Sequence, residues 1–264
     1  MAVYDAPAGP VHYALEGSGP MVTLIHGVGS DLESWDGVVT AMGPGYRILR
    51  YDLRGHGRSA RIRGRYEIGD FVADLAGLLD HLKIARTHLV GFSLGGIIAQ
   101  GFALAHADRI ERLALVSAVA GRTPEERDTV MQRYRALGEG GGSSHVSASL
   151  SRWFTDEFIA ANRDLIEQRL ARGRTTDPEC YAAAYRVLAE CDLGDELHAI
   201  TAPTLVMTGE HDQGSNARMS RLMAERIPDS RLHILDRLKH SILVEAPDVV
   251  AEKLVSFLQS EAAK

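Results

Sequence analysis

One stretch decides the fold of this 264-residue chain: Leu89-Val90-Gly91-Phe92-Ser93-Leu94-Gly95-Gly96. Residues 87–92 are largely apolar and run into glycine-rich chain, which predicts a short buried strand. Residues 94–105 are rich in Ala, Gly, Ile and Leu and contain no proline, which predicts a buried helix. Gly91 and Gly95 flank the serine at the corner, where larger side chains would collide with neighbouring backbone. This G-x-S-x-G pattern between a strand and a helix indicates an exposed nucleophilic serine.

The position of Ser93 at the start of a predicted helix also suits catalysis. The first amide groups of a helix and its dipole favour negative charge that develops nearby. G-x-S-x-G also occurs by chance in glycine-rich loops, where it has no catalytic meaning. Here the pattern follows a strand and opens a helix in the required order, so we favour the catalytic interpretation.

The composition is that of an ordinary globular protein and disfavours several classes of function. Apolar residues make up 45% and charged residues 24%, and a net charge of −6 comes from mixed signs. Because no segment is strongly basic, we expect neither a nucleic-acid partner nor a polybasic membrane anchor. No apolar run reaches the length of a membrane span, and the first residues lack a signal-peptide pattern. We therefore expect a cytoplasmic protein without a membrane partner.

Predicted strands and helices alternate through residues 1–120 and 199–264, which indicates an α/β fold with a mostly parallel, doubly wound sheet. The predicted strands are residues 11–16, 22–26, 46–51, 87–92, 112–117, 204–208 and 231–235. The predicted helices are residues 31–42, 68–82, 94–105, 216–227 and 247–258. Functional groups gather at the carboxyl ends of such strands. After the third strand we expect a structural, hydrogen-bonded turn held by Asp52 and Arg54.

The alternation stops between residues 121 and 198, where the sequence predicts helices and no strand. The expected helices are residues 124–137, 146–154, 156–172 and 178–191. Such an insertion predicts a helical cap over the strand ends of a core formed by residues 1–120 and 199–264. Cys180 and Cys191 both fall in the last of these helices. At roughly 16 Å apart along its axis, they cannot form a disulfide with each other.

A serine hydroxyl is a poor nucleophile at neutral pH unless a base takes its proton and an acid orients that base. Two candidates follow predicted strands after the serine: Asp212 and then His240. The order Ser-Asp-His is the one expected when the nucleophile lies on a G-x-S-x-G turn. Glu210 lies two residues before Asp212, and residue spacing alone does not choose between these two carboxylates.

The serine turn and the Ser-Asp-His order are features of the α/β-hydrolase superfamily, which the sequence resembles along nearly its whole length. The matching segments are His26-Gly27-Val28-Gly29, Asp52-Leu53-Arg54-Gly55-His56-Gly57-Arg58-Ser59, Gly91-Phe92-Ser93-Leu94-Gly95-Gly96, Gly209-Glu210-His211-Asp212 and Lys239-His240-Ser241. The resemblance implies that Ser93 is the nucleophile, that His240 is the general base and acid, and that Asp212 orients the histidine. It also implies an oxyanion hole made by the backbone N–H groups of Val28 and Leu94. Because the elbow residue is Ser rather than Asp, epoxide opening and halide displacement are disfavoured.

Two cap segments are similar to those of 3-oxoadipate enol-lactonases and related carboxylesterases: Arg152-Trp153-Phe154-Thr155 and Asp177-Pro178-Glu179-Cys180-Tyr181. Gln213 is a departure, since enol-lactonases more often carry proline directly after the acid. The resemblance implies hydrolysis of a small carboxylic ester or lactone through an acyl-enzyme, with no metal or cofactor. We expect Trp153 and Phe154 to line the substrate pocket, with Arg152 as a carboxylate partner. In the alternative, Trp153 and Phe154 only hold the cap to the core.

Three other functions are compatible with this fold. The first is hydrolysis of a carbon–carbon bond in a ring-fission product, and the second is perhydrolysis without a cofactor. The third is a receptor that hydrolyses its small-molecule ligand slowly. Fast turnover of p-nitrophenyl acetate would favour an esterase, whereas stoichiometric labelling with almost no turnover would favour a receptor.

Overall fold

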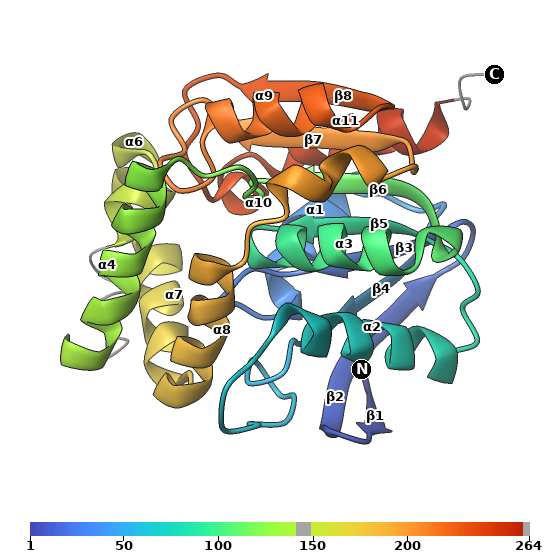
Figure 1. Ribbon diagram of the computed structural model, residues 1–264, viewed down its shortest axis with the longest axis horizontal. Coiled ribbons are helices and arrows are strands. Elements are labelled where there is room, and N and C mark those ends of the chain that lie inside the picture. The colour runs from blue at the N-terminus through green and yellow to red at the C-terminus, as the bar shows by residue number, and fades with distance from the viewer. Residues whose placement is uncertain (141–148, 261–264) are drawn as a thin grey trace.

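In the part of the chain that the structure describes, residues 1–140 and 149–260, eight strands form one sheet. This computed structural model orders them β1-β2-β4-β3-β5-β6-β7-β8 (Figure 1). The strands are β1 (Ala2–Ala6), β2 (Gly9–Gly17), β3 (Met21–Ile25), β4 (Arg47–Tyr51), β5 (Thr87–Phe92), β6 (Ile110–Val116), β7 (Thr204–Gly209) and β8 (Ser230–Leu235). β2 is antiparallel to β1 and β4, and every pairing from β4 to β8 is parallel. The mostly parallel sheet expected from the sequence is therefore confirmed, with an additional edge strand, β1.

Alternate residues along the strands point to opposite faces of the sheet and build two apolar clusters. In β5, Leu89 belongs to one cluster and Val90 to the other, and both side chains are fully buried. In β6, Leu115 and Val116 divide in the same way. Burial on both faces explains why these strands are continuous apolar runs in the sequence rather than alternating ones.

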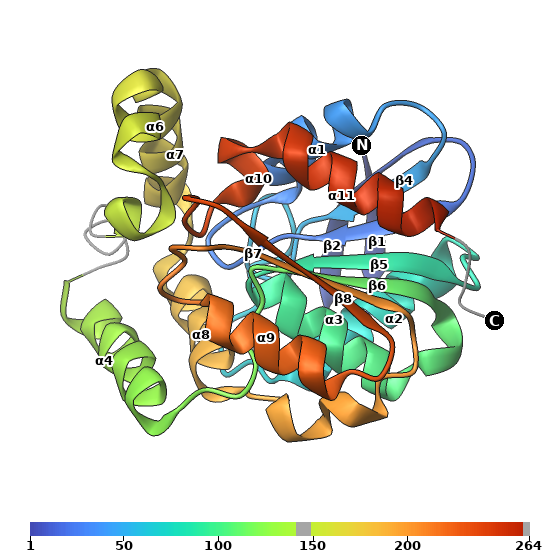
Figure 2. The same cartoon turned by 90° about the horizontal axis from the view of Figure 1, so that it is seen from above.

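Helices cover both faces of the sheet, as Figure 2 shows from above. One face carries η1 (Leu32–Trp35), α1 (Asp36–Met42), α10 (Ile242–Glu245) and α11 (Pro247–Gln259). The other face carries α2 (Ile68–His81), α3 (Leu94–Ala105), η2 (Ala107–Arg109), η3 (Gly194–Ala199) and α9 (Ala217–Arg226). Each helix expected outside residues 121–198 is present. The one expected over residues 31–42 is divided into a 3₁₀ helix, η1, and α1, and the ends of the others differ by at most one residue from the prediction.

A group of helices between β6 and β7, which we call the cap helices, lies beyond one end of the sheet (Figures 1 and 2). They are α4 (Pro124–Gly140), α6 (Asp156–Ala161), α7 (Arg163–Thr175) and α8 (Pro178–Glu190), together with helical residues 149–153. The prediction of a single helix over residues 156–172 is wrong, because two helices, α6 and α7, occupy this segment. Asn162 leaves the helical conformation, and its side-chain amide donates to Phe158 O at 3.0 Å, which ends α6. Residues 146–148 of another expected helix lie outside the described residues.

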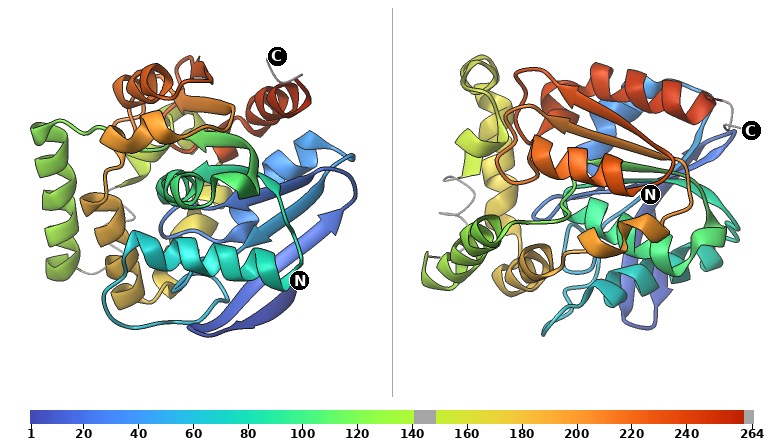
Figure 3. Two further views of the ribbon diagram at one scale, coloured as in Figure 1. Left: turned by 45° about the vertical axis from the view of Figure 1, so that its right-hand side comes forward. Right: turned by 45° about the horizontal axis from the view of Figure 1, so that its top comes forward.

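In both views of Figure 3, α4 (light green) and the C-terminal helix α11 (red) lie on opposite sides of the molecule. Cys180 is buried in α8 and Cys191 directly follows this helix, and both thiols are free. Within the described residues, no helix combines the length and the apolar character that a membrane crossing requires.

Candidate active site

Ser93 occupies a strained corner between β5 and α3. Its backbone has φ 56° and ψ −115°, a region that residues other than glycine rarely adopt. A Cβ atom on Gly91 would lie 2.1 Å from Gly95 O, and one on Gly95 would lie 2.4 Å from Ile25 O. The turn therefore leaves no space for a side chain at either glycine, as the sequence predicted. It holds the serine hydroxyl at the start of α3.

The two backbone amides that the sequence analysis assigned to an oxyanion hole belong to Leu94 and Val28, on two segments beside Ser93. Leu94 supplies the first amide of α3, and the first amides of a helix have no partner within it. Val28 belongs to the loop after β3, and a Cβ on the preceding Gly27 would lie 3.1 Å from Ser93 Cβ. The loop that carries the Val28 N–H therefore passes directly against the serine. Val28 and Ser93 also line the same cavity.

His26 holds this loop in place. Its Nε2 accepts the Leu53 N–H at 3.0 Å, so Nδ1 carries the ring proton and donates to Gly27 O at 2.7 Å. Burial lowers the pKa of His26, although the Asp52 carboxylate opposes this effect. Burial and the neighbouring His26 also lower the pKa of His56, to about 4. Both histidines are therefore neutral near pH 7, and their contacts support the turns around the serine.

The turn after β4 is held by Asp52 and Arg54, as expected from the sequence. Asp52 accepts the N–H groups of Leu32 at 2.8 Å and Arg58 at 2.9 Å. Arg54 makes a two-point ion pair with Asp74 at 2.7 and 2.8 Å. The Asp52–Leu32 bond connects the β4 turn to the chain that follows the Val28 loop, and the Arg54–Asp74 pair connects it to α2.

Asp212 lies in the loop after β7, and its side chain is completely buried. Its Oδ1 accepts the N–H groups of Gly214 (2.8 Å) and Ser215 (2.9 Å). Its Oδ2 accepts from His240 Nδ1 at 2.7 Å and from the Thr208 hydroxyl at 3.3 Å. Burial alone would raise the pKa of this carboxyl, but His240 and the two N–H groups outweigh burial and hold the pKa below its ordinary value. Asp212 is therefore an ionised carboxylate that orients the His240 ring.

The Glu210 side chain has different hydrogen-bond partners from that of Asp212. Its side chain is partly exposed and accepts the Arg237 N–H at 2.9 Å. The His211 ring, also largely exposed, lies 3.7 Å from the Glu210 carboxylate. Of the two carboxylates that the sequence left open, Asp212 is therefore the one that contacts His240.

His240 follows β8 and faces the serine's cavity. Because Nδ1 donates to Asp212, Nε2 is the ring nitrogen of His240 that is left to accept a proton. The ring lies 5.0 Å from that of Phe92, the residue that precedes Ser93. Next to the histidine, Ser241 N–H donates to Trp153 O at 2.8 Å, so this loop also contacts the cap.

A cavity of about 290 Å³ opens between Ser93 and the cap helices. Its walls include Ser93, His240 and Val28 from the core and Arg152 and Trp153 from the cap. This volume lies near the lower end of the range for small-molecule sites. The described residues contain no group of three or more His, Cys, Asp or Glu side chains placed to bind a metal ion.

A second cavity of about 130 Å³ lies beside the first, and Trp153 lines both. Phe154 lines the second cavity, where its fully buried ring stacks on Phe158 at a centroid distance of 5.4 Å. The two aromatic residues expected in the pocket therefore differ in position. Trp153 faces the serine's cavity, whereas Phe154 packs within the cap behind it.

Arg133 of α4 also lines the serine's cavity, and the sequence analysis did not single it out. Burial and the charge of Arg133 lower the pKa of Arg152, so two guanidinium groups share this part of the cap. Helical spacing is the signal that could have found Arg133. It shares a face of α4 with Thr129 and Val130, which line the same cavity.

Comparison with known proteins identifies the family. A family model described as the alpha/beta hydrolase fold matches residues 20–247. The chain belongs to the α/β-hydrolase family. This result confirms the superfamily resemblance and identifies the chain as a hydrolase.

Several relatives of this α/β hydrolase span nearly its whole length. An (E)-2-((N-methylformamido)methylene)succinate hydrolase of Acinetobacter baylyi is 29% identical over 94% of each chain. A 3-oxoadipate enol-lactonase of the same organism is 29% identical over 90% of this chain and 88% of its own. The crystal structure of an enol-lactonase from Burkholderia xenovorans superposes with a TM-score of 0.91 at 31% identity, covering 98% of this chain and 100% of that one. The resemblance to enol-lactonases is therefore confirmed.

Proposed function

We propose that this α/β hydrolase cleaves a small carboxylic ester or lactone through an acyl-enzyme on Ser93. One observation carries the proposal: the Asp212–His240 pair, joined at 2.7 Å, lines the same cavity as Ser93. Relatives named as enol-lactonases support an ester or lactone bond as the target.

In the first half of the reaction, Ser93 Oγ attacks the carbonyl carbon while His240 Nε2 takes the hydroxyl proton. The oxygen that becomes negative accepts hydrogen bonds from the Val28 and Leu94 N–H groups. As the carbon–oxygen bond of the ester breaks, protonated His240 gives its proton to the departing alcohol oxygen. Asp212 stays ionised and holds the ring in the orientation that both transfers need.

In the second half, His240 Nε2 takes a proton from water as the water oxygen attacks the acyl carbonyl. The ester bond to Ser93 breaks, the proton returns to Ser93 Oγ and the carboxylic acid leaves. When the substrate is a lactone, the alcohol released in the first half remains part of the acyl group. The product is then a single hydroxy acid, or its keto form after an enol lactone opens.

We assign selectivity to the cap formed by residues 121–198. Trp153 limits the length of the acyl group, with Phe154 packed behind it. Arg152 and Arg133 bind a carboxylate of the substrate, because both residues line the cavity. The names of two relatives contain oxoadipate and succinate, which are dicarboxylic acids, and this agrees with a basic subsite.

The experiment is a turnover measurement with p-nitrophenyl acetate, combined with mass spectrometry of the trapped acyl-enzyme. We expect many equivalents of p-nitrophenol per chain and an acetyl group on the peptide that contains Ser93. A receptor would release about one equivalent and then stop. An acetyl group found on a different residue would refute the proposal.

A further inference from the structure

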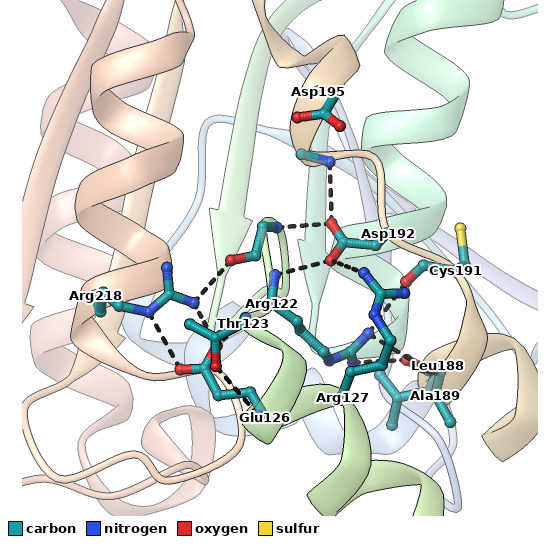
Figure 4. A network of polar contacts seen from close by, with 12 residues as sticks. Arg122, Thr123, Glu126, Arg127, Leu188, Ala189, Cys191, Asp192, Asp195 and Arg218 are labelled. Carbon is teal, nitrogen blue, oxygen red and sulfur yellow. Dashed lines mark hydrogen bonds and ion pairs between the residues drawn. The ribbon is translucent and has the colours of Figure 1, made fainter.

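The first cap helix begins with a capping box made by Thr123 and Glu126 (Figure 4). The Glu126 carboxylate accepts the Thr123 N–H at 2.8 Å, and the Glu126 N–H donates to Thr123 Oγ1 at 3.3 Å. These bonds satisfy amide groups that the start of a helix leaves without partners. Glu126 and Thr123 together therefore cap the start of α4.

The same carboxylate also binds the start of α9. Asn216 Nδ2 donates to Glu126 Oε1 at 2.7 Å, and the Arg218 guanidinium donates to both carboxylate oxygens (Figure 4 shows Arg218). Arg218 also donates to Gly121 O at 2.8 Å, close to where α4 begins. Burial would raise the pKa of Glu126, but Arg218, Thr123 and Asn216 outweigh it and hold the pKa below its usual value. One ionised carboxylate therefore joins a cap helix to the core.

Asn216 connects this contact to the loop of Asp212. Its Oδ1 accepts the Met219 N–H at 3.0 Å and caps α9. The preceding residue, Ser215, donates its N–H to Asp212 Oδ1 at 2.9 Å, and its carbonyl accepts the Thr208 hydroxyl at 2.9 Å. A displacement of Asn216 would therefore move a hydrogen-bond donor of Asp212.

A second group of contacts at the cap junction connects different segments of the chain. Asp192 accepts the N–H groups of Gly121 at 2.6 Å, Arg122 at 2.8 Å and Gly194 at 3.0 Å. The Arg122 guanidinium donates to Leu188 O at 2.7 Å near the end of α8 (Figure 4). These bonds join the chain that enters the cap to the chain that leaves it. The contacts of Glu126, in contrast, include Asn216, which adjoins the loop of Asp212.

We infer that Glu126 is a positioning residue, which holds α4 and the loop of Asp212 in one fixed relation. Glu126 itself lines the serine's cavity, as do Thr129 and Val130 in the next turn of α4, so the wall of the pocket and the acid share this anchor. The inference rests on the proposed function, because it takes Asp212 as the acid that orients His240. Its consequence is that Glu126 affects the rate even for a substrate too small to need the cap.

The test substrate is p-nitrophenyl acetate, because loosening the cap alone should leave kcat on so small an acyl group unchanged. We expect Glu126→Ala to lower kcat about tenfold, comparable to losing one hydrogen bond to a charged group. Glu126→Gln keeps an acceptor for Asn216 Nδ2 and should restore most of the rate. Thr123→Val removes the hydroxyl of the capping box but leaves the Glu126–Asn216 contact, so its kcat should match wild type.

Asn216→Ser provides an independent variant. A serine keeps a side-chain cap for the Met219 N–H but loses the amide that donates to Glu126. Asn216 is not among the residues that line the serine's cavity in the described chain, so direct contact with substrate does not explain an effect. We expect its loss in kcat to resemble that of Glu126→Ala, and the losses should not add in the double variant.

The outcomes separate this inference from the proposed function. Wild-type kcat on acetate in both Glu126→Ala and Asn216→Ser, with Ser93→Ala inactive, would overturn the role of Glu126 and leave the proposed function intact. Additive losses in the double variant would also overturn the inference. An active Ser93→Ala enzyme would overturn both.

Discussion

The turn at Ser93 and the junction of the cap are held by different kinds of contact. At the turn, backbone lies against backbone, so that a Cβ on Gly91 or Gly95 would come within 2.4 Å of a carbonyl oxygen. At the junction, charged side chains such as Glu126 and Arg218 meet at partly exposed positions. Close backbone packing permits little displacement, whereas a single exposed ion pair contributes little to the free energy of folding. The groups proposed for chemistry therefore lie on the more rigid region.

The helices of the two regions also differ in how much of their surface is buried. Most of α3 is buried, including Leu94, Ile97 and Phe102. In α4, Val130 and Leu137 are buried, while many of its charged residues are exposed. Substitutions at the turn should therefore remove catalysis or the fold. Apart from the anchor at Glu126, substitutions in the cap should mainly change which substrates are accepted. Four predictions can break or sharpen this contrast.

The largest effect is expected for Ser93→Ala. Loss of the nucleophile should reduce kcat by about 10⁴-fold or more. Because only a hydroxyl is removed, the melting temperature should stay close to that of the wild type. Hydrolysis of p-nitrophenyl acetate and thermal unfolding measure the two properties. More than a tenth of the wild-type rate would show that Ser93 is not the nucleophile.

The next effect concerns the two carboxylates after β7. Asp212→Asn should lower kcat by about 10³-fold or more, because a neutral amide no longer stabilises the protonated His240 ring or its tautomer. Glu210→Gln is the matched control, since Glu210 bonds to the Arg237 N–H rather than to His240. Its rate should change less than about twofold. The reverse ranking of the two variants would overturn the assignment of the acid.

The third prediction compares two glycines. In Gly95→Ala the new Cβ would meet Ile25 O at 2.4 Å, and we expect a loss of about 1–3 kcal/mol in the free energy of unfolding. In Gly69→Ala the new Cβ in α2 meets no atom within 4 Å, and we expect a gain of about 0.5–1 kcal/mol. Urea denaturation measures both. Equal stability of the two variants would contradict the tight packing of the turn.

The smallest effect is expected in the cap, for Trp153→Ala. Trp153 lines both cavities, of about 290 and 130 Å³, so its removal should join them. The wild type should prefer acetate and butyrate to octanoate, and the variant should shift this ratio about tenfold toward octanoate. The assay compares these esters and an enol-lactone on both proteins, with melting temperatures alongside. Equal wild-type rates on acetate and octanoate would contradict a small pocket, and an unfolded variant would assign Trp153 a structural role.

Most of the fold could be predicted from local patterns of sequence. The strand and helix around Ser93 have the expected ends, because an apolar run, two glycines and a serine depend only on near neighbours. β1 was missed because it is an edge strand with mostly exposed side chains, so burial leaves little pattern in it. The break at Asn162 was missed because one polar residue interrupts an otherwise helical run.

The sequence by itself determined the α/β architecture, the serine turn and the short list of acid and base candidates. Only the tertiary structure decided that Asp212 rather than Glu210 contacts His240, 28 residues away. It also decided that Trp153, rather than Phe154, lines the cavity of Ser93. The physical reason is the same in each case. Steric and periodic constraints act over a few residues, whereas the direction of a side chain in a loop is set by hydrogen bonds to segments far away along the chain.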